Sequence, residues 1–172
     1  LDTMPDHLAS LFAQIGPPAR EALPALFRRL PGARPKWRPD LYRAIGRVGV
    51  ETDEGVPALL AGLRDPVLAA RLAVPAGLAA RAAENPAALE GLGRALLDKE
   101  LLVRRKSAEA LRSLGRAAAG ALPALLTGLE TEDSGLFVTL VRAIGAMGPG
   151  GRVAVPHLAR LLLERDGWEA YE

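Results

Sequence analysis

The hydrophobic and polar positions of this chain repeat with a period of 33 residues. Four stretches share a pattern in which a proline follows an apolar residue and precedes further leucines: "EALPALFRRL" (21–30), "GVPALLAGLR" (55–64), "GALPALLTGL" (120–129) and "VAVPHLARLL" (154–163). The shared prolines are Pro24, Pro57, Pro123 and Pro156. Glu90 lies midway between the second and third of them, where an altered copy of the pattern is found. Five related units are therefore expected, as in a repeat protein.

Each unit contains two apolar stripes with helical spacing. Counted from the shared proline, the first stripe lies at positions −16, −13, −12 and −9, which in the first unit are Leu8, Leu11, Phe12 and Ile15. The second stripe lies at −1, +2, +3 and +6. Both spacings place the apolar side chains on one face of an amphipathic helix. Each unit is therefore predicted to form two helices, and the second begins at the proline, where the missing N–H would be unsatisfied anyway.

Glycine recurs at position −8, just after the first stripe. It is present in four units as Gly16, Gly49, Gly115 and Gly148, whereas the third unit has Ala82. A glycine in the left-handed conformation commonly ends a helix, because it has no side chain to clash. The sequence therefore predicts that these glycines end the first helices.

A pair of such helices cannot bury its apolar stripes alone, so neighbouring units are expected to stack. The predicted fold class is all-α, a right-handed α-solenoid of five 33-residue helix-turn-helix repeats within a single domain, 1–172. The repeats are 2–34, 35–67, 68–100, 101–133 and 134–166, followed by a short tail, 167–172. Because the chain begins at Leu1 instead of Met, two interpretations stay open: a fragment of a longer protein, and a complete small array.

The third unit departs most from the pattern. Pro75 lies inside its predicted first helix and is expected to kink it, since proline removes a helical hydrogen bond. Arg81 replaces an apolar residue, Glu90 replaces the proline, and Gly93 replaces a larger residue at position +3. These changes predict a bend or a locally weaker region in the array.

The turns between units carry a second conserved spacing of polar residues within the chain. In the pair Asp65-Pro66 the aspartate is predicted to cap the next helix, with proline at its first position, and Asp98 holds the same place one unit later. Arg71 and Arg104 follow these aspartates by six residues. Capping in register is a sufficient structural reason for the aspartates, and the arginines are interpreted as their structural partners.

The repeated units of this chain resemble HEAT repeats, most closely the short bacterial HEAT-like kind also found in phycobilin lyases. The resemblance rests on "LYRAIGRVG" followed by "GVPALLAGLRD", and on "VRRKSAEALRSLG" followed by "ALPALLTGL". The Asp and Arg positions match those that such repeats use between neighbours. Gly32, Thr131 and Phe137 depart from them, so any polar ladder is expected to be interrupted at both ends. The resemblance implies a binding scaffold without identifying its target.

Composition narrows the class of protein. The net charge is only +2, aromatic residues make up 4% of the chain, and there is no cysteine, which excludes disulfides and thiolate chemistry. No apolar run approaches the ~18 residues that indicate a membrane span. The start of the chain lacks the basic and apolar regions of a signal peptide. We therefore expect a cytoplasmic protein that does not associate with membranes.

Candidate catalytic residues are few. His7 and His157 lie in different units, and neither belongs to the His-Glu pairs that metal hydroxylases built on HEAT-like repeats carry. The four serines lack the G-x-S-x-G context of a nucleophile elbow. We therefore expect no enzyme activity, no cofactor and no bound metal.

In HEAT-type arrays the second helices line the concave face, which directs attention to positions +1 and +4. Both positions lie outside the apolar stripe and are expected to face solvent. Position +1 is small in four of the five units, and position +4 carries an arginine in alternate units. Arginine binds carboxylates and phosphates bidentately. The residues predicted to contact a partner are Arg28, Arg94, Thr127, His157 and Arg160, with Trp37 from the Pro-rich turn "PGARPKWRP".

The leading hypothesis is a non-catalytic scaffold whose concave groove receives an acidic or extended segment of another protein, or of another domain of the same protein. A simple solvated face with scattered arginines is the plain alternative for these positions. A nucleic-acid phosphate-backbone binding module is a second function class, based on the arginines and lysines of residues 20–47, although acidic stretches elsewhere make the charge dipolar. A bilin-lyase-like accessory protein is a third.

Overall fold

Pairs of helices stacked in chain order make up the protein. The computed structural model describes residues 4–164, with side chains from residue 7 to residue 163, and within them the chain is all-helical and contains no strand. The first helix of each pair is α1 (Met4–Ile15), α3 (Arg38–Val48), α5 (Leu68–Ala82), α7 (Leu101–Leu114) and α9 (Ser134–Ala146). The second is α2 (Leu23–Arg29), α4 (Val56–Gly62), α6 (Pro86–Ala95), α8 (Leu122–Gly128) and α10 (Val155–Glu164).

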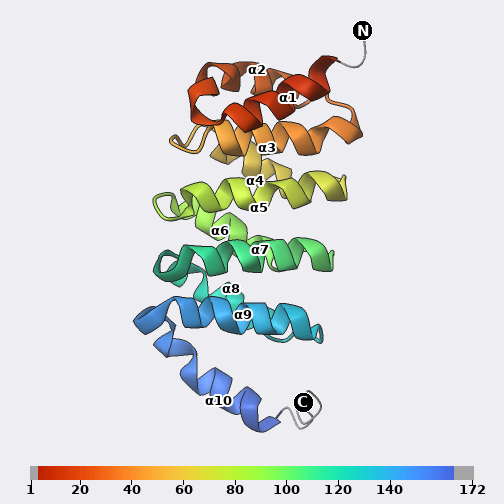
Figure 1. Cartoon of the computed structure of the whole chain (residues 1–172). Helices are drawn as coiled ribbons and strands as arrows, with labels where there is room; N and C mark the ends of the chain where they lie inside the picture. Colours follow the sequence, from red (N-terminus) through yellow and green to blue (C-terminus); the bar gives the residue numbers. More distant parts are fainter. Residues whose placement is uncertain (1–3, 165–172) are drawn as a thin grey trace.

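The first helices form one layer of the stack. Helix α1 packs on α3, α3 on α5, α5 on α7 and α7 on α9, and Figure 1 shows them one below another. The second helices form the other layer, and each of α2, α4, α6 and α8 packs against the first helix of the next pair. Short 3-10 segments complete the connections: η1 (Pro17–Ala22), η2 (Pro35–Trp37), η3 (Gly115–Ala121) and η4 (Gly148–Ala154).

Glycine ends most of the first helices, as predicted. Gly16, Gly115 and Gly148 have φ values of 71°, 56° and 60°, in the region that favours glycine, and each precedes or opens a 3-10 segment. Gly49 also directly follows the last residue of α3, but its φ is −87°, so it ends the helix without the expected left-handed conformation. A β-carbon there would lie 2.9 Å from the carbonyl oxygen of Ile45, so close packing explains this glycine better than its backbone conformation does.

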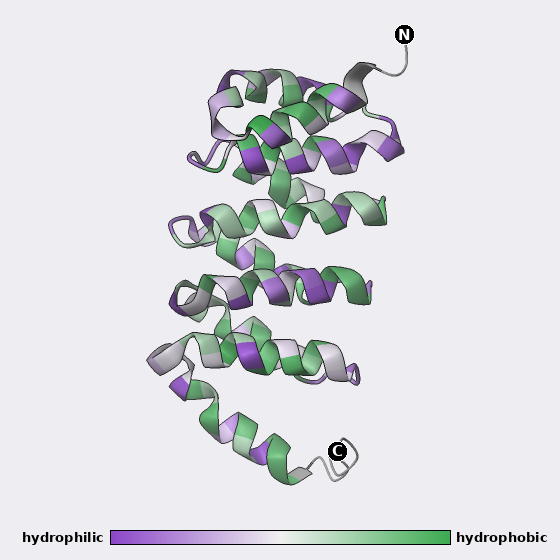
Figure 2. Cartoon of the chain, viewed as in Figure 1, coloured by the Kyte–Doolittle hydropathy of each residue, from purple (hydrophilic) through white to green (hydrophobic). Residues whose placement is uncertain are grey.

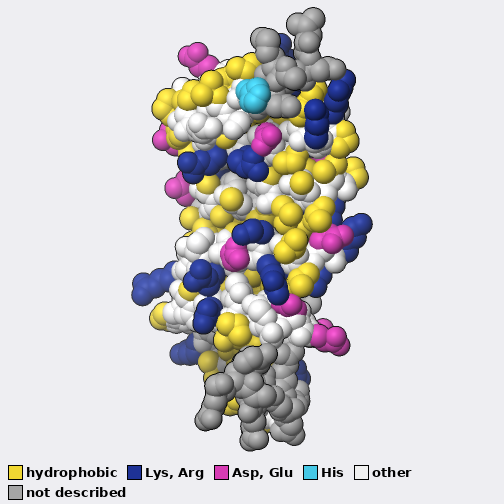
Figure 3. Space-filling view, turned by 45° about the vertical axis from the view of Figure 1, so that its right-hand side comes forward, with side chains coloured by type: hydrophobic (Ala, Val, Ile, Leu, Met, Phe, Trp, Pro, Cys, Tyr) yellow, Lys and Arg dark blue, Asp and Glu magenta, His cyan; other side chains and the backbone are white. Residues whose placement is uncertain are grey.

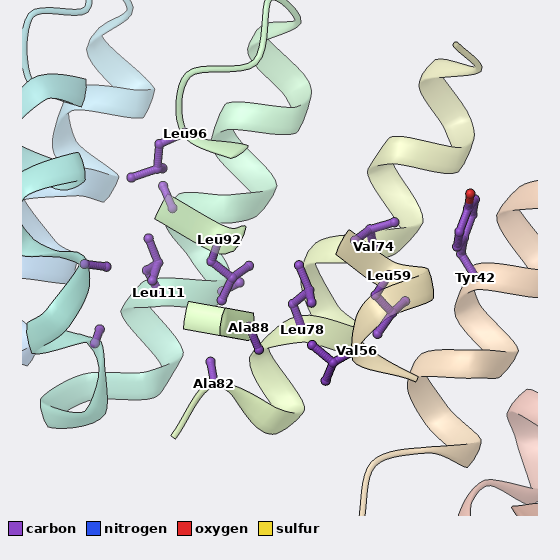
Figure 4. Packing of buried hydrophobic residues seen from close by; sticks show 14 of the residues in the cluster. Tyr42, Val56, Leu59, Val74, Leu78, Ala82, Ala88, Leu92, Leu96 and Leu111 are labelled. Atoms are coloured by element: carbon purple, nitrogen blue, oxygen red, sulfur yellow. The ribbon is translucent and has the colours of Figure 1, made fainter. Parts of the chain in front are cut away.

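The core lies between successive pairs. Leu59 of α4 and Leu78 of α5 are fully buried, and the same is true of Leu92 of α6 and Leu111 of α7. Figure 4 shows these side chains in one continuous row across the stack. Figure 2 shows hydrophobic residues recurring in every helix with hydrophilic residues between them, as amphipathic helices require. The apolar stripes read from the sequence are thus the surfaces that bury one pair against the next.

Helices α3 and α5 approach each other especially closely. A β-carbon added to Gly46 would lie 2.7 Å from the Cα of Gly77, and one added to Gly77 would lie 2.9 Å from the Cα of Gly46. Real β-carbons do not come this close to another atom, so a side chain at either position would push the two helices apart. The helices can pack this closely because both residues are glycine. Gly46 lies at position −11 and Gly77 at position −13, which defines how one first helix meets the next.

The irregular third unit forms both of its helices despite its departures from the pattern. Helix α5 runs without interruption through Pro75, which is buried. Helix α6 begins at Pro86, four residues before Glu90, and Asn85 caps it by accepting a hydrogen bond from the Ala88 amide at 3.1 Å. Pro86 therefore starts this helix in place of the missing proline.

Arg81, at an otherwise apolar position, is satisfied by the preceding turn. Its Nε donates to Asp53 Oδ1 at 3.1 Å, and its Nη1 donates to the Val50 carbonyl at 3.3 Å. Hydrogen bonds from Asn85 and Arg81 lower the pKa of Asp53. The substitution of arginine for an apolar residue thus links α5 to the turn that joins α3 and α4.

Among the helices of residues 4–164, none is both long and apolar enough to cross a membrane.

Candidate binding groove

A groove of about 450 Å³ lies between the second helices α4 and α6 and the turns that follow them. We call it the α4–α6 groove. Its lining residues are Leu60, Ala61, Leu63, Arg64, Arg94, Ala95, Leu97 and Asp98. Most of them occupy positions +3, +4, +6, +7 and +8 of their units, which lie at the C-terminal ends of the two second helices. Consecutive second helices present these ends side by side, so the groove follows from the stacking itself.

Two arginines provide the positive charge of the groove. Arg94 is exposed, and its Nε lies 3.8 Å from Glu90 Oε1, one turn earlier in α6. Such an exposed pair adds little stability and leaves the guanidinium available to another anion. Arg64 is also exposed, and it forms no ion pair with the residues that the structure describes. The groove therefore presents guanidinium groups that a carboxylate could engage bidentately.

The apolar part of the groove is equally distinctive. Leu97 is 60% exposed although it is a large hydrophobic residue, and Leu60 and Leu63 are half-buried beside it. Ala61 and Ala95 are small, which keeps the space between the leucines open. An apolar side chain of a partner would be partly removed from water here.

Position +1 is less exposed than the sequence suggested. Gly91 is buried because the Leu60 side chain covers it: a β-carbon at Gly91 would lie only 2.4 Å from Leu60 Cδ2. The expectation of a small-residue floor open to solvent was therefore wrong at this position. Leu60 lies over Gly91 and itself lines the groove.

Asp98 forms the polar wall of the groove and is held in a fixed orientation. Its Oδ2 accepts a hydrogen bond from Arg71 Nε at 2.9 Å, and its Oδ1 accepts one from the Glu100 amide at 2.8 Å. Because Arg71 compensates its charge, Asp98 does not oppose an anionic partner as an unpaired carboxylate would.

The predicted capping role of the aspartates was wrong. Helices α5 and α7 begin at Leu68 and Leu101, three residues after Asp65 and Asp98. Asp65 Oδ1 accepts from the amide of Val67 at 2.9 Å, so the aspartate closes a turn that leads into the helix. The cause is that Val67 and Glu100 have extended backbones and separate each aspartate from its helix.

Arginines and aspartates nevertheless form a ladder between neighbouring units. Arg38 Nη1 lies 3.3 Å from both carboxylate oxygens of Asp65, and Arg71 Nη1 donates to the Asp65 carbonyl at 2.9 Å. Arg104 Nη1 donates to the Asp98 carbonyl at 2.8 Å. Arg71 and Arg104 thus bond the aspartate turn before them, and Arg38 and Arg71 pair with the aspartate of their own unit.

The ladder changes at the positions where the sequence departs from the pattern. Thr131 stands where the next aspartate is expected, and Arg105 pairs with Asp133 at 2.9 Å instead. Asp133 caps α9 by accepting a hydrogen bond from the Leu136 amide. This hydrogen bond and the nearby Arg105 both lower the pKa of the Asp133 carboxyl. At the other end Arg38 Nε donates to the Ala33 carbonyl at 3.1 Å.

Of the residues predicted to contact a partner, the structure places only Arg94 in the α4–α6 groove. Arg28, Thr127 and Arg160 are exposed on α2, α8 and α10 but do not line it. His157 is half-buried on α10, and its Nδ1 lies 3.4 Å from Arg160 Nη2. The structure does not bring these residues together with Arg94 in one pocket.

The prediction that Trp37 contacts a partner is corrected by its burial. The side chain is only 5% exposed, in the 3-10 segment η2 that leads into α3. Arg29, Arg34 and Lys36 surround its ring, with their charged ends 5.2–5.4 Å from the ring centroid. Trp37 therefore supports the basic turn from within.

Sequence reasoning missed Arg64 and Leu97. Both occupy position +7, one helical turn beyond +3 and +4, where the units otherwise carry Pro31, Glu130 and Leu163. Helical spacing places +7 on the same side as +4, so this position could have been included with it.

Within the described part of the chain, no three His, Cys, Asp or Glu residues lie together in a way that could hold a metal ion. On the face that Figure 3 shows, lysines and arginines are scattered among hydrophobic and acidic side chains and form no continuous basic stripe. The arrangement in the groove is suited to binding: a carboxylate at the guanidinium groups and an apolar group at the leucines.

Neither a family model nor a curated protein sequence matches this chain. Among solved structures, the chain is similar to an engineered protein whose crystal structure comes from the Northeast Structural Genomics Consortium. The two share 20% sequence identity at a TM-score of 0.58, over 94% of this chain and 83% of that one. At this identity the likeness concerns the fold alone, and it agrees with an all-helical chain.

Proposed function

We propose that this protein is a HEAT-like right-handed α-solenoid of five repeats that acts as a non-catalytic, cytoplasmic protein-binding scaffold. The α4–α6 groove receives an extended segment of another protein or domain. The observation that carries the proposal is that Arg64 and Arg94 lie in one groove with Leu97, a large apolar residue that is mostly exposed. Exposed apolar residues bordered by charge are typical of interaction sites.

The groove favours a particular kind of segment. Arginine pairs bidentately with carboxylates, so the segment carries Glu or Asp at the positions that reach Arg64 and Arg94. Between them it carries one large apolar side chain, which packs against Leu60, Leu63 and Leu97. The stack supplies stability through its buried core, so the groove is formed before the partner arrives, which lowers the entropic cost of binding.

Selection from a peptide library tests this. The library displays extended peptides with one Leu, Ile or Phe flanked by Glu or Asp at varied spacing, and selected peptides are measured by fluorescence anisotropy against the purified chain. The double variant Arg64→Glu with Arg94→Glu should weaken binding by at least about tenfold, equivalent to about 1.4 kcal/mol. Leu97→Ser should weaken it through the apolar contact alone.

The matched control is Arg28→Glu with Arg160→Glu, which makes the same charge change on α2 and α10, outside the groove. It should leave the affinity within about twofold, because neither residue lines the groove and salt screens exposed surface charges. No enrichment of acidic, apolar peptides, or equal losses in both double variants, would refute the groove as the binding site.

The nucleic-acid alternative is tested in the same assay with labelled single- and double-stranded oligonucleotides. Binding to phosphates falls steeply with salt because counterions are released. Tight oligonucleotide binding with that salt dependence, in place of peptide binding, would replace the scaffold proposal.

A further inference from the structure

The two ends of the stack expose positions that are buried or half-buried in the other units. At the first end, Leu8, Leu11 and Ile15 of α1 are each 46% exposed. The residues at the same positions in α3 are Leu41, Ala44 and Val48, and all three are buried against the preceding unit. Helix α1 thus presents the surface with which every later first helix meets its neighbour.

At the other end, no helix of the described residues 4–164 follows α10, whereas each of the other second helices packs against the next first helix. A groove of about 700 Å³ lies between α9 and α10, lined chiefly by apolar residues that include Phe137, Val141, Leu158 and Leu162. Leu162 at position +6 is 82% exposed, whereas Leu96 and Leu129 at that position are buried. In the earlier units the first helix of the next unit fills the equivalent space.

The internal junctions show which atoms would meet if the first end entered this groove. At the junction of α3, α4 and α5, Gly77 at position −13 contacts Gly46 of the preceding first helix and Leu59 of the preceding second helix. The residue at position −13 in α1 is Leu11. The residues that correspond to Gly46 and Leu59 in the last unit are Gly145 and Leu158.

The sizes of these residues are complementary. A β-carbon added to Gly145 would meet nothing within 4 Å, so the last unit has open space at this point. Leu11 is the one large residue at position −13, where later units have Ala44, Gly77, Ala110 and Ala143. Across such a contact the large Leu11 side chain would lie against Gly145, where the open space accommodates it, and the two helices would lie further apart than α3 and α5 do.

A second pair of positions is apolar on both sides of the contact. Gly128 at position +5 of α8 lies against Leu140 at position −16 of α9, where a β-carbon would be 3.1 Å from Leu140 Cδ1. The equivalent pair across the open ends is Leu161 of α10 and Leu8 of α1. Both are apolar, so this contact would also remove hydrocarbon from water.

We propose that the α9–α10 groove of one copy binds α1 of a second copy, so that chains associate head to tail through the same positions that join their own units. The two surfaces differ, so the contact is heterologous and can continue from copy to copy.

Sedimentation velocity over a range of concentrations tests the proposal. The wild-type chain should rise from the monomer mass of 18.1 kDa toward larger species as concentration increases. Leu11→Glu disables the first end and Leu162→Glu the last, so each variant alone should stay monomeric. Both residues are substantially exposed in the single copy, and circular dichroism checks that the variants remain helical.

An equal mixture of the two variants gives the decisive result. Leu11→Glu keeps an intact last end and Leu162→Glu keeps an intact first end, so the mixture should form a dimer of one copy each and nothing larger. Dimerisation in the mixture also shows that both variants fold. Leu102→Glu, an equivalent change of an exposed leucine on α7, away from both ends and from the α4–α6 groove, should associate like the wild type.

Three outcomes would overturn the proposal. One is a wild-type chain that stays at the monomer mass at every concentration. Another is self-association of either variant alone, which would indicate a contact between like ends. The last is a mixture that remains monomeric although both variants are helical.

Discussion

Arg71 and Asp98 form an ion pair that is almost completely withdrawn from solvent. Nε of the arginine lies 2.9 Å from Oδ2 of the aspartate, and the two side chains are 6% and 11% exposed. Nη1 of the same arginine donates to the carbonyl of Asp65, so a single guanidinium joins the turn before α5 to the turn after α6. The pair is therefore part of the junction between units as well as the wall of the α4–α6 groove.

Removing one partner of this pair should be costly. Arg71→Ala leaves the Asp98 carboxylate largely buried without its counter-ion and leaves the Asp65 carbonyl without its donor. Breaking a buried pair in this way costs about 3–5 kcal/mol. Urea unfolding monitored by circular dichroism measures the loss, and Lys106→Ala, which removes the exposed pair with Glu109, should cost less than about 1 kcal/mol. Similar losses in the two variants would contradict a structural role for Arg71.

The leucines of the repeated phrases should contribute differently to the free energy of unfolding, depending on whether the stack buries them. Leu59→Ala and Leu125→Ala remove fully buried side chains and should each destabilise the chain by about 2–5 kcal/mol. Leu162→Ala removes an exposed leucine from a related phrase and should change stability by no more than about 0.5 kcal/mol in dilute solution. Equal losses at all three positions would mean that α10 is covered in the monomer.

The sequence was sufficient to predict the helix pairs because several positions kept one register across the chain. Apolar spacing gave the buried faces, and three of the four glycines at position −8 have a positive φ, which glycine tolerates best. The turns were harder, because the two residues after Asp65 and Asp98 can extend the chain or continue a helix. Their backbone conformation depends on the arginines of neighbouring units, which local sequence does not reveal.

The groove was predicted only in part. Position +4 was identified, and Arg94 lies in the groove, but +7 was overlooked, with Arg64 and Leu97. The sequence correctly placed Trp37 in a turn, but a residue in a turn can be either exposed or buried. Only the structure shows that this side chain is buried, with three cations around its ring. Burial of Gly91 depends on the rotamer of Leu60 from another unit, which repeat spacing alone does not fix.

Gly46 and Gly145 share position −11 but should respond oppositely to alanine. At Gly46 the added β-carbon meets the backbone of Gly77, so α3 and α5 must move apart, at a cost of about 1–3 kcal/mol. At Gly145 the space is open and alanine favours the helix, which should stabilise the chain by about 0.4–1 kcal/mol. Thermal unfolding at low protein concentration compares the two. Stabilisation by Gly46→Ala would show that the helices are not in close contact.

Tyr42 should make stability depend on pH in the alkaline range. The pKa of Tyr42 is raised from 10.0 to about 12. The largest cause is burial and the second is the carboxylate of Asp65, since both disfavour the phenolate. Its hydroxyl lies 3.2 Å from Asp65 Oδ2 and donates to it. The unfolded chain releases this proton near pH 10 while the folded chain keeps it, so the stabilisation is complete below pH 10 and is lost as pH rises toward 12.

Tyr42→Phe separates this effect from general alkaline unfolding. Below pH 10 the variant should be less stable than the wild type by about 0.5–1.5 kcal/mol, because the hydrogen bond to Asp65 is missing. Between pH 10 and 12 the difference should shrink, since phenylalanine does not ionise. Urea unfolding at several pH values measures this convergence, and tyrosinate absorbance should show a late ionisation step in the wild type that the variant lacks. A constant stability difference across that range would mean that Tyr42 ionises as readily in the folded chain as in the unfolded one.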